Sequence, residues 1–220
     1  MIAALGEGPA PDRAPVGYVS DFFDWYAEEF DTHLTGNLNY TGPLQVVGTL
    51  RVLRPKGVRR VVDMGCGTGL AGLAVQGLVG PMIGIDLSYE MLAKAAARGI
   101  YGELIEDDLY PTMRAQADGS ADAILAADVF IYMGELAPLF VECCRVLAPS
   151  GIFIATFEDA QRTTDSWKLE HSERYTRALP YLERIAAEAG FTEIFSSPTV
   201  LREEHGAPVN SLLVSFEVPQ

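Results

Sequence analysis

An aspartate followed by three alternating glycines is the stretch of this chain best suited to hold a ligand. Asp63 follows two β-branched residues, and glycines stand at positions 65, 67 and 69. Glycine adopts positive φ and has no Cβ, so such a stretch can turn sharply from strand to helix and let a ligand approach the backbone. A carboxylate aimed into that turn repels a pyrophosphate. Asp63 therefore predicts a ligand that is cationic or donates hydrogen bonds.

A second acid stands about twenty residues further on, at a spacing typical of nucleotide-binding folds. Asp86 ends the apolar segment 83–86, which predicts a second strand. A carboxylate at that place accepts hydrogen bonds from ribose hydroxyls. The two motifs together, Asp-x-Gly-x-Gly-x-Gly and the acid-ended second strand, resemble those of class I S-adenosylmethionine-dependent methyltransferases.

Two other interpretations fit the glycines alone. Residues 67–72 match the pattern Gly-x-Gly-x-x-Gly of dinucleotide-binding dehydrogenases, which also place an acid at the end of the second strand. In that register the fingerprint starts late and Asp63 has no purpose. A purely structural glycine turn is the other alternative.

The resemblance implies a set of residues around S-adenosylmethionine. Asp63 and the backbone of residues 65–67 are expected to hold the aminocarboxylate end, Asp63 directly or through water. Asp86 is expected to bind the ribose. The acid-then-apolar pair after the third strand, Asp108 and Leu109, is expected to bind the adenine, with Asp107 as the fallback for Asp108. The full set of expected cofactor-binding residues is Tyr26, Asp63, Gly65, Cys66, Gly67, Asp86, Leu87, Met91, Asp108, Leu109 and Asp128.

Asp128 follows the predicted fourth strand, where the methyl group is expected to meet its acceptor; the alternative is a helix cap or turn acid. A sulfonium methyl is electrophilic, so the protein mainly has to align the acceptor and exclude water. Tyr132 and His171 are the candidate catalytic residues, and packing or a solvated surface position is the alternative for each. His205 and Tyr40 are weaker candidates of the same kind.

A narrower resemblance covers residues 18–43. The patterns Phe-Asp-x-Tyr-Ala-x-x-Phe-Asp-x-His-Leu and Leu-Asn-Tyr-x-x-Pro resemble the N-terminal lid of the methyltransferase subfamily described as TPR-associated or Williams-Beuren-region-like. This implies that Tyr26 lies near the methionine end of the cofactor. The subfamily commonly has His-Ser after an Arg-Tyr before the last helix, whereas this chain has Thr-Arg at 176–177.

Composition limits the partners. The chain has 220 residues, 49% hydrophobic and 21% charged, which fits one domain with a sizeable core. A formal net charge of −14 disfavours nucleic acid as a partner. Three cysteines give neither a disulfide framework nor a metal-ligand spacing, and no segment resembles a signal peptide or a membrane span. We therefore expect a cytoplasmic protein without a metal, acting on a small molecule.

Apolar runs and amphipathic segments alternate along the chain, which predicts an α/β fold: a Rossmann-like, doubly wound, mainly parallel seven-stranded sheet with a C-terminal antiparallel hairpin and an N-terminal helical lid. Residues 1–15 are expected to be flexible and residues 16–220 to form a single domain. Within it, 16–56 form the lid, beginning with a helix over 19–34, and 158–179 form a polar insertion over the site. Strands are expected at 59–64, 82–86, 100–105, 121–127, 152–157, 191–200 and 211–218, and helices at 44–53, 70–79, 89–98, 136–147 and 180–189.

The sequence thus predicts a methyltransferase that transfers a methyl group from S-adenosylmethionine to a small molecule by in-line displacement. A regulatory protein that binds the cofactor without turnover, and a NAD-dependent oxidoreductase, are the alternatives.

Overall fold

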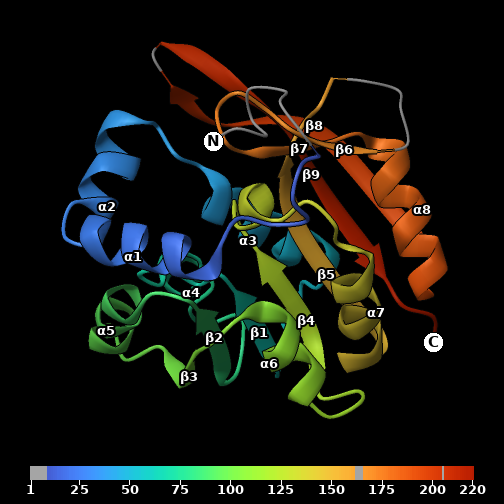
Figure 1. Ribbon diagram of the computed structural model, residues 1–220. Coiled ribbons are helices and arrows are strands. Elements are labelled where there is room, and N and C mark those ends of the chain that lie inside the picture. Colours follow the sequence, from blue (N-terminus) through green and yellow to red (C-terminus); the bar gives the residue numbers. More distant parts are fainter. Residues whose placement is uncertain (1–8, 162–165, 205) are drawn as a thin grey trace.

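The structure, a computed structural model, describes residues 9–161, 166–204 and 206–220. A seven-stranded sheet with strand order β3-β2-β1-β4-β5-β9-β8 forms its centre (Figure 1). Strands β1 to β5 run parallel, and β9 is antiparallel to both of its neighbours. The predicted fold class is confirmed. The strands are β1 (Val61–Met64), β2 (Met82–Asp86), β3 (Tyr101–Glu106), β4 (Ala121–Ala126), β5 (Leu147–Glu158), β8 (Glu193–Glu204) and β9 (Ala207–Glu217).

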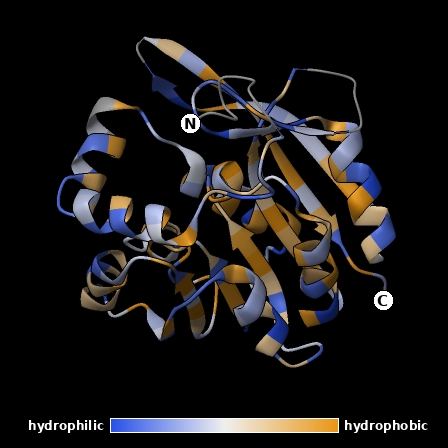
Figure 2. Ribbon diagram, in the orientation of Figure 1, coloured by the Kyte–Doolittle hydropathy of each residue, from blue (hydrophilic) through white to orange (hydrophobic). Residues whose placement is uncertain are grey.

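Helices cover both faces of the sheet. One apolar cluster joins the sheet to residues of α6, α7 and α8, and a second joins it to α3 and to Val75, which follows α4. Strand β4 lies between the clusters, and Ala123 to Ala126 are fully buried, as a central parallel strand requires. Figure 2 shows these central strands as the most hydrophobic part of the chain. The helices are α3 (Gly42–Leu53), α4 (Leu70–Ala74), α5 (Tyr89–Ala97), α6 (Leu109–Ala115), α7 (Ala137–Val146) and α8 (Leu179–Ala189).

The N-terminal segment is helical, but it is not the single helix predicted over 19–34. It consists of α1 (Val16–Tyr26), the single turn α2 (Phe30–Thr32) and the π-helical turn η2 (His33–Asn37). The first helix begins at Val16, earlier than predicted, and the Ser20 hydroxyl within it donates to the Leu87 carbonyl at 3.0 Å. The break lets aromatic residues on both sides of it face one cavity. We call residues 16–41, from α1 to the start of α3, the lid segment.

Strand ends differ from the prediction in the C-terminal third. Strand β8 continues to Glu204 and β9 starts at Ala207, so residues 202–204 belong to a strand and not to a connecting loop. The polar stretch 158–179 contains a small hairpin of β6 (Trp167–Leu169) and β7 (Tyr175–Arg177), with Tyr175 and Arg177 buried. The polar composition of this stretch concealed the burial of Tyr175 and Arg177, because the residues that bury them come from distant parts of the chain.

Two further elements depart from expectation. The helix predicted over 70–79 ends at Ala74, because the chain turns at Gly77, whose φ is 77°. Helix α6 was not predicted. Its seven residues begin at Leu109, directly after the two aspartates expected near the adenine.

The start of the described chain is bound to the domain. The Ala14 N–H donates to the Tyr132 carbonyl at 2.8 Å, and the Gly134 N–H donates to the Asp12 carbonyl at 2.7 Å. Residues 12–14 thus make backbone hydrogen bonds to the domain, and residues 1–8 lie outside the described part; the expected flexibility of residues 1–15 stays a prediction. None of the described helices has the length and apolar character needed to cross a membrane.

Ser88 links the sheet to the lid segment. Its buried hydroxyl accepts from the Met91 N–H at 3.1 Å, as the predicted cap of α5, and donates to Asp24 of α1 at 2.6 Å. We expect Ser88→Ala to lower the free energy of unfolding by about 1–2 kcal/mol, since it removes a cap and leaves the half-buried carboxylate of Asp24 with fewer donors. Urea denaturation measures this difference.

Ser172→Ala is the matched control for that measurement, because Ser172 is exposed in a turn. Its free energy of unfolding should stay within about 0.5 kcal/mol of the parent. If Ser88→Ala behaves like Ser172→Ala, the buried hydroxyl does not stabilise the junction.

Candidate functional site

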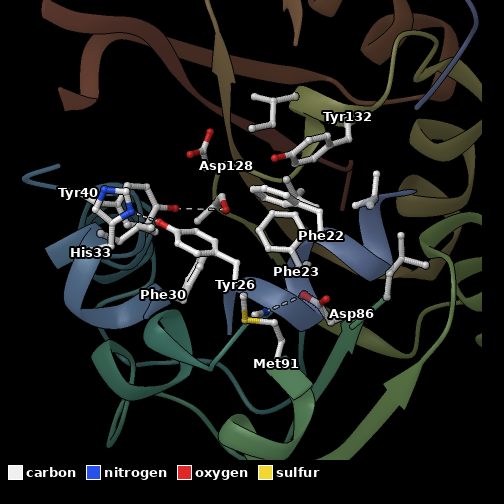
Figure 3. A pocket seen from close by; sticks show the side chains of 18 of the residues that line it. Phe22, Phe23, Tyr26, Phe30, His33, Tyr40, Asp86, Met91, Asp128 and Tyr132 are labelled. Atoms are coloured by element: carbon white, nitrogen blue, oxygen red, sulfur yellow. Dashed lines mark hydrogen bonds between the residues drawn. The ribbon is translucent and has the colours of Figure 1, made fainter. Parts of the chain in front are cut away.

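A cavity of about 690 Å³ lies at the carboxyl ends of the parallel strands, beneath the lid segment. Its volume falls in the range of small-molecule sites. Figure 3 shows aromatic rings from the lid segment gathered around this space with Asp86, Asp128 and Tyr132. Of the predicted site residues, those that line it are Tyr26, Gly65, Gly67, Asp86, Leu87, Met91, Leu109, Asp128 and Tyr132.

The glycine turn follows β1 as predicted. Gly65, Gly67 and Gly69 have φ of 63°, 53° and 89°, the left-handed region that favours glycine. A Cβ on Gly65 would stand 2.2 Å from a Val129 methyl carbon, so glycine is needed there to let the turn pack against the segment after β4. The sequence pattern therefore has a steric reason in addition to ligand access.

Three N–H groups of this turn already have acceptors inside the protein. The Cys66 N–H donates to the Ile85 carbonyl at 3.0 Å and the Gly67 N–H to Asp86 Oδ2 at 2.8 Å. The Gly69 N–H donates to the Cys66 carbonyl at 2.9 Å. The helix that follows, α4, has only five residues. These three donors are therefore turned away from a ligand, and the turn is not followed by the long helix that favours a pyrophosphate.

Asp63 is buried next to the glycine turn. It is 1% exposed and lines a small pocket together with Cys66, but it does not line the large cavity; the two share the lining residues Gly65 and Gly67. The Tyr101 hydroxyl donates to Asp63 Oδ2 at 2.7 Å. Burial raises the pKa of Asp63 to about 7, against the lowering effect of that hydrogen bond. A cationic group on the other side of the turn would relieve this burial penalty.

Tyr101 reaches Asp63 because glycines leave room for its ring. A Cβ on Gly72 would stand 2.7 Å from the Tyr101 hydroxyl oxygen, and a Cβ on Gly84 would stand 2.9 Å from its ring. The partnership of Tyr101 with Asp63 was not predicted. A tyrosine at the start of the third strand, with glycines at 72 and 84 in the preceding elements, is the signal that could have found it.

Asp86 joins the turn to the start of α5. Its Oδ2 accepts from Gly67 N–H, and its Oδ1 accepts from the Ser88 N–H at 3.0 Å. Burial raises the pKa of Asp86, while these backbone donors lower it. Each oxygen has a second lone pair, so the carboxylate can still accept from a ligand in the cavity that it lines.

Of the two aspartates after β3, the fallback Asp107 lines the cavity and Asp108 does not. Asp108 caps α6, with its Oδ1 accepting from the Tyr110 N–H at 3.0 Å, and its Oδ2 accepts from the Arg13 guanidinium. Both oxygens are thus used within the fold. Asp108 is thus the cap of the unpredicted helix α6, and the fallback Asp107 is the one of the two that lines the cavity, so the expected adenine carboxylate stays a prediction that now falls on Asp107.

Asp128 occupies the place expected for it after β4. Its φ is 60°, a conformation tolerated by aspartate but uncommon, and its N–H donates to the Thr156 hydroxyl at 2.8 Å. Its Oδ2 accepts from Arg202, whereas its buried Oδ1 has no hydrogen-bond partner among the described residues. Burial raises the pKa of Asp128, and the guanidinium of Arg202 opposes that rise.

The two candidate catalytic residues differ in position. Tyr132 lines the cavity, and burial raises its pKa to about 12, so at neutral pH its hydroxyl is a donor rather than an anion. His171 is exposed in the turn between β6 and β7 and does not line the cavity; this part of the prediction is corrected. His205 lies outside the described residues. His33 lines the cavity instead, and its Nδ1 is hydrogen-bonded to the Tyr26 hydroxyl.

A group of ionised side chains around Asp128 was not predicted from the sequence. Arg202 is only 3% exposed and contacts three carboxylates. The spacing of 202 and 204 places both on one face of β8, a signal hidden by the assumption that they belong to a loop. We call this group the charged cluster: Asp128, Glu158, Arg174, Arg202 and Glu204.

Comparison with known proteins agrees with this geometry. Residues 62–155, from β1 into β5, match a family described as a methyltransferase domain. The ubiquinone biosynthesis O-methyltransferase of Xanthomonas oryzae pv. oryzae is 28% identical over 101 residues, which are 44% of this chain and 42% of that protein. The chain thus spans less than half the length of this curated relative.

Solved structures share the fold over nearly the whole chain. The Burkholderia thailandensis 1,6-didemethyltoxoflavin-N1-methyltransferase, with bound S-adenosylhomocysteine, has a TM-score of 0.70 and 15% identity, covering 97% of this chain and 94% of that one. A phosphoethanolamine N-methyltransferase 2 of Haemonchus contortus has a TM-score of 0.71 and 20% identity, covering 96% and 62%. The resemblance to class I methyltransferases is supported, and the narrower resemblance of the lid segment stays a prediction.

The burial of Asp63 predicts a pH dependence of stability. A carboxyl whose pKa rises from 3.8 in the unfolded chain to about 7 in the fold binds more protons when folded, so stability is lost as pH rises between these values. At about 1.4 kcal/mol per pH unit, the loss is complete once the pH exceeds the folded pKa of about 7, and it amounts to roughly 4 kcal/mol. Asp63→Asn should remove it, and the ligand-free variant should unfold at higher urea concentration than the parent at about pH 8.

Asp21→Asn provides the control, because Asp21 is exposed on α1. It should keep the pH dependence of the parent between about pH 5 and pH 8. Equal slopes for Asp63→Asn and the parent would show that Asp63 is ionised in the fold at all these pH values.

Proposed function

We propose that this chain is an S-adenosylmethionine-dependent methyltransferase that acts on a small molecule. The observation that carries the proposal is the set of carboxylates at the ends of three adjacent strands, Asp63, Asp86 and Asp107, around the glycine turn. The match of residues 62–155 to a methyltransferase domain supports it. The free cysteines of the described chain agree with the cytoplasmic location expected from the sequence.

The donor set fits the parts of this cofactor. Asp86 and Asp107 line the cavity and supply acceptors for ribose hydroxyls and for the adenine amino group. Leu87, Met91 and Leu109 line the same region and supply apolar surface for the base. The ammonium group is assigned to the turn beside Asp63, a buried carboxylate whose pKa is raised by desolvation. Tyr26 and Asp128 complete the proposed set at the methionine end.

The same features disfavour a dinucleotide. A pyrophosphate needs free backbone donors at the start of a helix, and here the N–H groups of residues 66, 67 and 69 donate to protein atoms. A pyrophosphate would also lie beside Asp63 and Asp86. The NAD-dependent alternative is therefore the weaker proposal.

Catalysis on this site depends on positioning. The cofactor, when bound, supplies an electrophilic methyl group on a sulfonium. The aromatic residues of the lid segment cover the cavity and exclude water from it, which favours displacement over side reactions. Tyr132 can donate a hydrogen bond to the acceptor, and Asp128 can accept one. Neither His171 nor another loop histidine is needed.

The size of the cavity favours turnover over mere cofactor binding. The carboxylates assigned to the cofactor stand at the ends of β2 and β3, near one edge of the sheet. The cavity has a second region, lined by Tyr40, Arg174 and Arg202, and Arg202 belongs to β8 at the other edge. A regulatory protein that only holds the cofactor has no need of this second region, which leaves room for an acceptor.

Calorimetric titration with S-adenosylhomocysteine and with NAD tests the cofactor. We expect S-adenosylhomocysteine to bind and NAD not to bind. Asp86→Ala should weaken S-adenosylhomocysteine binding by about 1.5–3 kcal/mol, because charge-assisted hydrogen bonds are lost. Glu106→Gln is the matched control, since Glu106 pairs with Asp86 in the sheet but is exposed. Binding of NAD in place of S-adenosylhomocysteine would contradict the proposed function.

Asp107 and Asp108 should separate in their effects. Asp107→Ala is expected to weaken S-adenosylhomocysteine binding about tenfold or more, because it removes an acceptor from the cavity. Asp108→Ala should leave that affinity nearly unchanged and lower the free energy of unfolding by about 1–2 kcal/mol, since it removes the cap of α6. Titration and urea denaturation of both variants decide this, and a reversed pattern would restore the original assignment to Asp108.

A further inference from the structure

The charged cluster holds its two guanidinium groups firmly. Arg202 uses three nitrogens: Nη1 donates to Asp128, Nη2 to Glu158, and Nε to Glu204 at 2.8 Å. Arg174 Nη1 donates to Glu204 at 2.5 Å and to Glu158 at 3.4 Å. Three carboxylates thus surround two cations. Every guanidinium nitrogen of Arg202 is thus directed at a protein carboxylate.

Negative charge prevails along the whole wall of the cavity. Among the described residues that line it, two are arginines, and five are carboxylates: Glu29, Asp86, Asp107, Asp128 and Glu204. The single positive charge that a bound S-adenosylmethionine adds does not balance this excess. A carboxylate or phosphate on the acceptor would enter a field of its own sign.

Aromatic rings stand between the cofactor region and the charged cluster. Phe23 packs edge to face on Tyr132 with ring centroids 5.6 Å apart, and Phe22 lies 5.7 Å from Tyr26. All four rings line the cavity. Rings attract cations through their negative faces, and they do so more strongly where water is excluded. Carboxylates beside aromatic rings form a site for a cationic nitrogen.

We infer that the methyl acceptor is an amine whose nitrogen binds between Asp128 and the rings of Phe22, Phe23, Tyr26 and Tyr132. The inference rests on the proposed function and names its substrate class. Asp128 is the carboxylate best suited to pair with the acceptor nitrogen, because it lines the cavity and its buried Oδ1 lacks a hydrogen bond among the described residues.

The same carboxylate can serve the reaction. An ammonium must lose a proton before its nitrogen has a lone pair to attack with, and Asp128 can take up that proton. The new bond joins nitrogen to the methyl carbon while the carbon–sulfur bond breaks, with its electron pair staying on sulfur. Burial raises the pKa of Asp128, which favours the uptake of the proton.

Three probes of one shape test the charge preference: benzylamine, benzyl alcohol and benzoate. Each is titrated by calorimetry into the protein saturated with S-adenosylhomocysteine, so no turnover is needed. We expect benzylamine to bind at least about tenfold more tightly than benzoate, with benzyl alcohol between them. Asp128→Asn should bring benzylamine and benzyl alcohol to similar affinity.

Glu193→Gln is the matched control, because Glu193 is an exposed carboxylate at the other end of β8 and its loss changes the net charge equally. It should keep the preference of the parent. Cooperative urea unfolding of Asp128→Asn, measured alongside the parent, shows that the variant is folded.

Several results would overturn the inference. These are tighter binding of benzoate than of benzylamine, no binding of benzylamine at millimolar concentration, and an unchanged preference in Asp128→Asn. If S-adenosylhomocysteine itself does not bind the parent, the proposed function fails first, and the inference fails with it. Binding of S-adenosylhomocysteine without a preference for the amine overturns the inference alone.

Discussion

The carboxylate of Asp86 is the constraint on which the site depends. It accepts one N–H from the glycine turn after β1 and one from the start of α5, so it fixes two turns that come from different strands. Through Ser88, which also contacts Asp24, the same junction sets the position of α1 over the cavity. A second contact repeats this logic: Asp31 of α2 accepts from the Thr68 hydroxyl at 2.5 Å within the glycine turn. The lid segment is therefore built onto the cofactor region.

The half of the site formed by β1 and β2 could be predicted because its information is local. A glycine that needs positive φ, an acid that ends an apolar strand and a serine that caps a helix each leave a mark within a few residues. Asp63, Gly65, Gly67 and Asp86 were located in this way. The prediction for Asp108 also used local information, but it missed the helix that starts at Leu109. Asp108 caps that helix, although it was expected to contact the cofactor.

The other half could not be predicted, because it depends on contacts between distant residues. Arg202 gains its role only when β8 runs past Val200 and brings it to Asp128 and Glu158, which stand 74 and 44 residues away in the chain. Nothing near Arg202 in the sequence indicates burial, and a stretch of charges before a glycine looks like a loop. Likewise, the break after Tyr26 depends on the packing of the lid segment, whereas its periodicity suited one continuous helix.

The link between the lid segment and β8 has a consequence for how this site can change. The Thr41 N–H donates to the Leu201 carbonyl and the Glu203 N–H donates to the Leu38 carbonyl, each at 2.8 Å. These bonds join backbone to backbone on both sides of Arg202, so they persist whatever side chains occupy these positions. The backbone link between the lid segment and β8 is therefore independent of the side chains that face the acceptor. Descendants of such a chain can exchange the charges facing the acceptor, and acquire new substrates, without having to reinvent the fold that holds them.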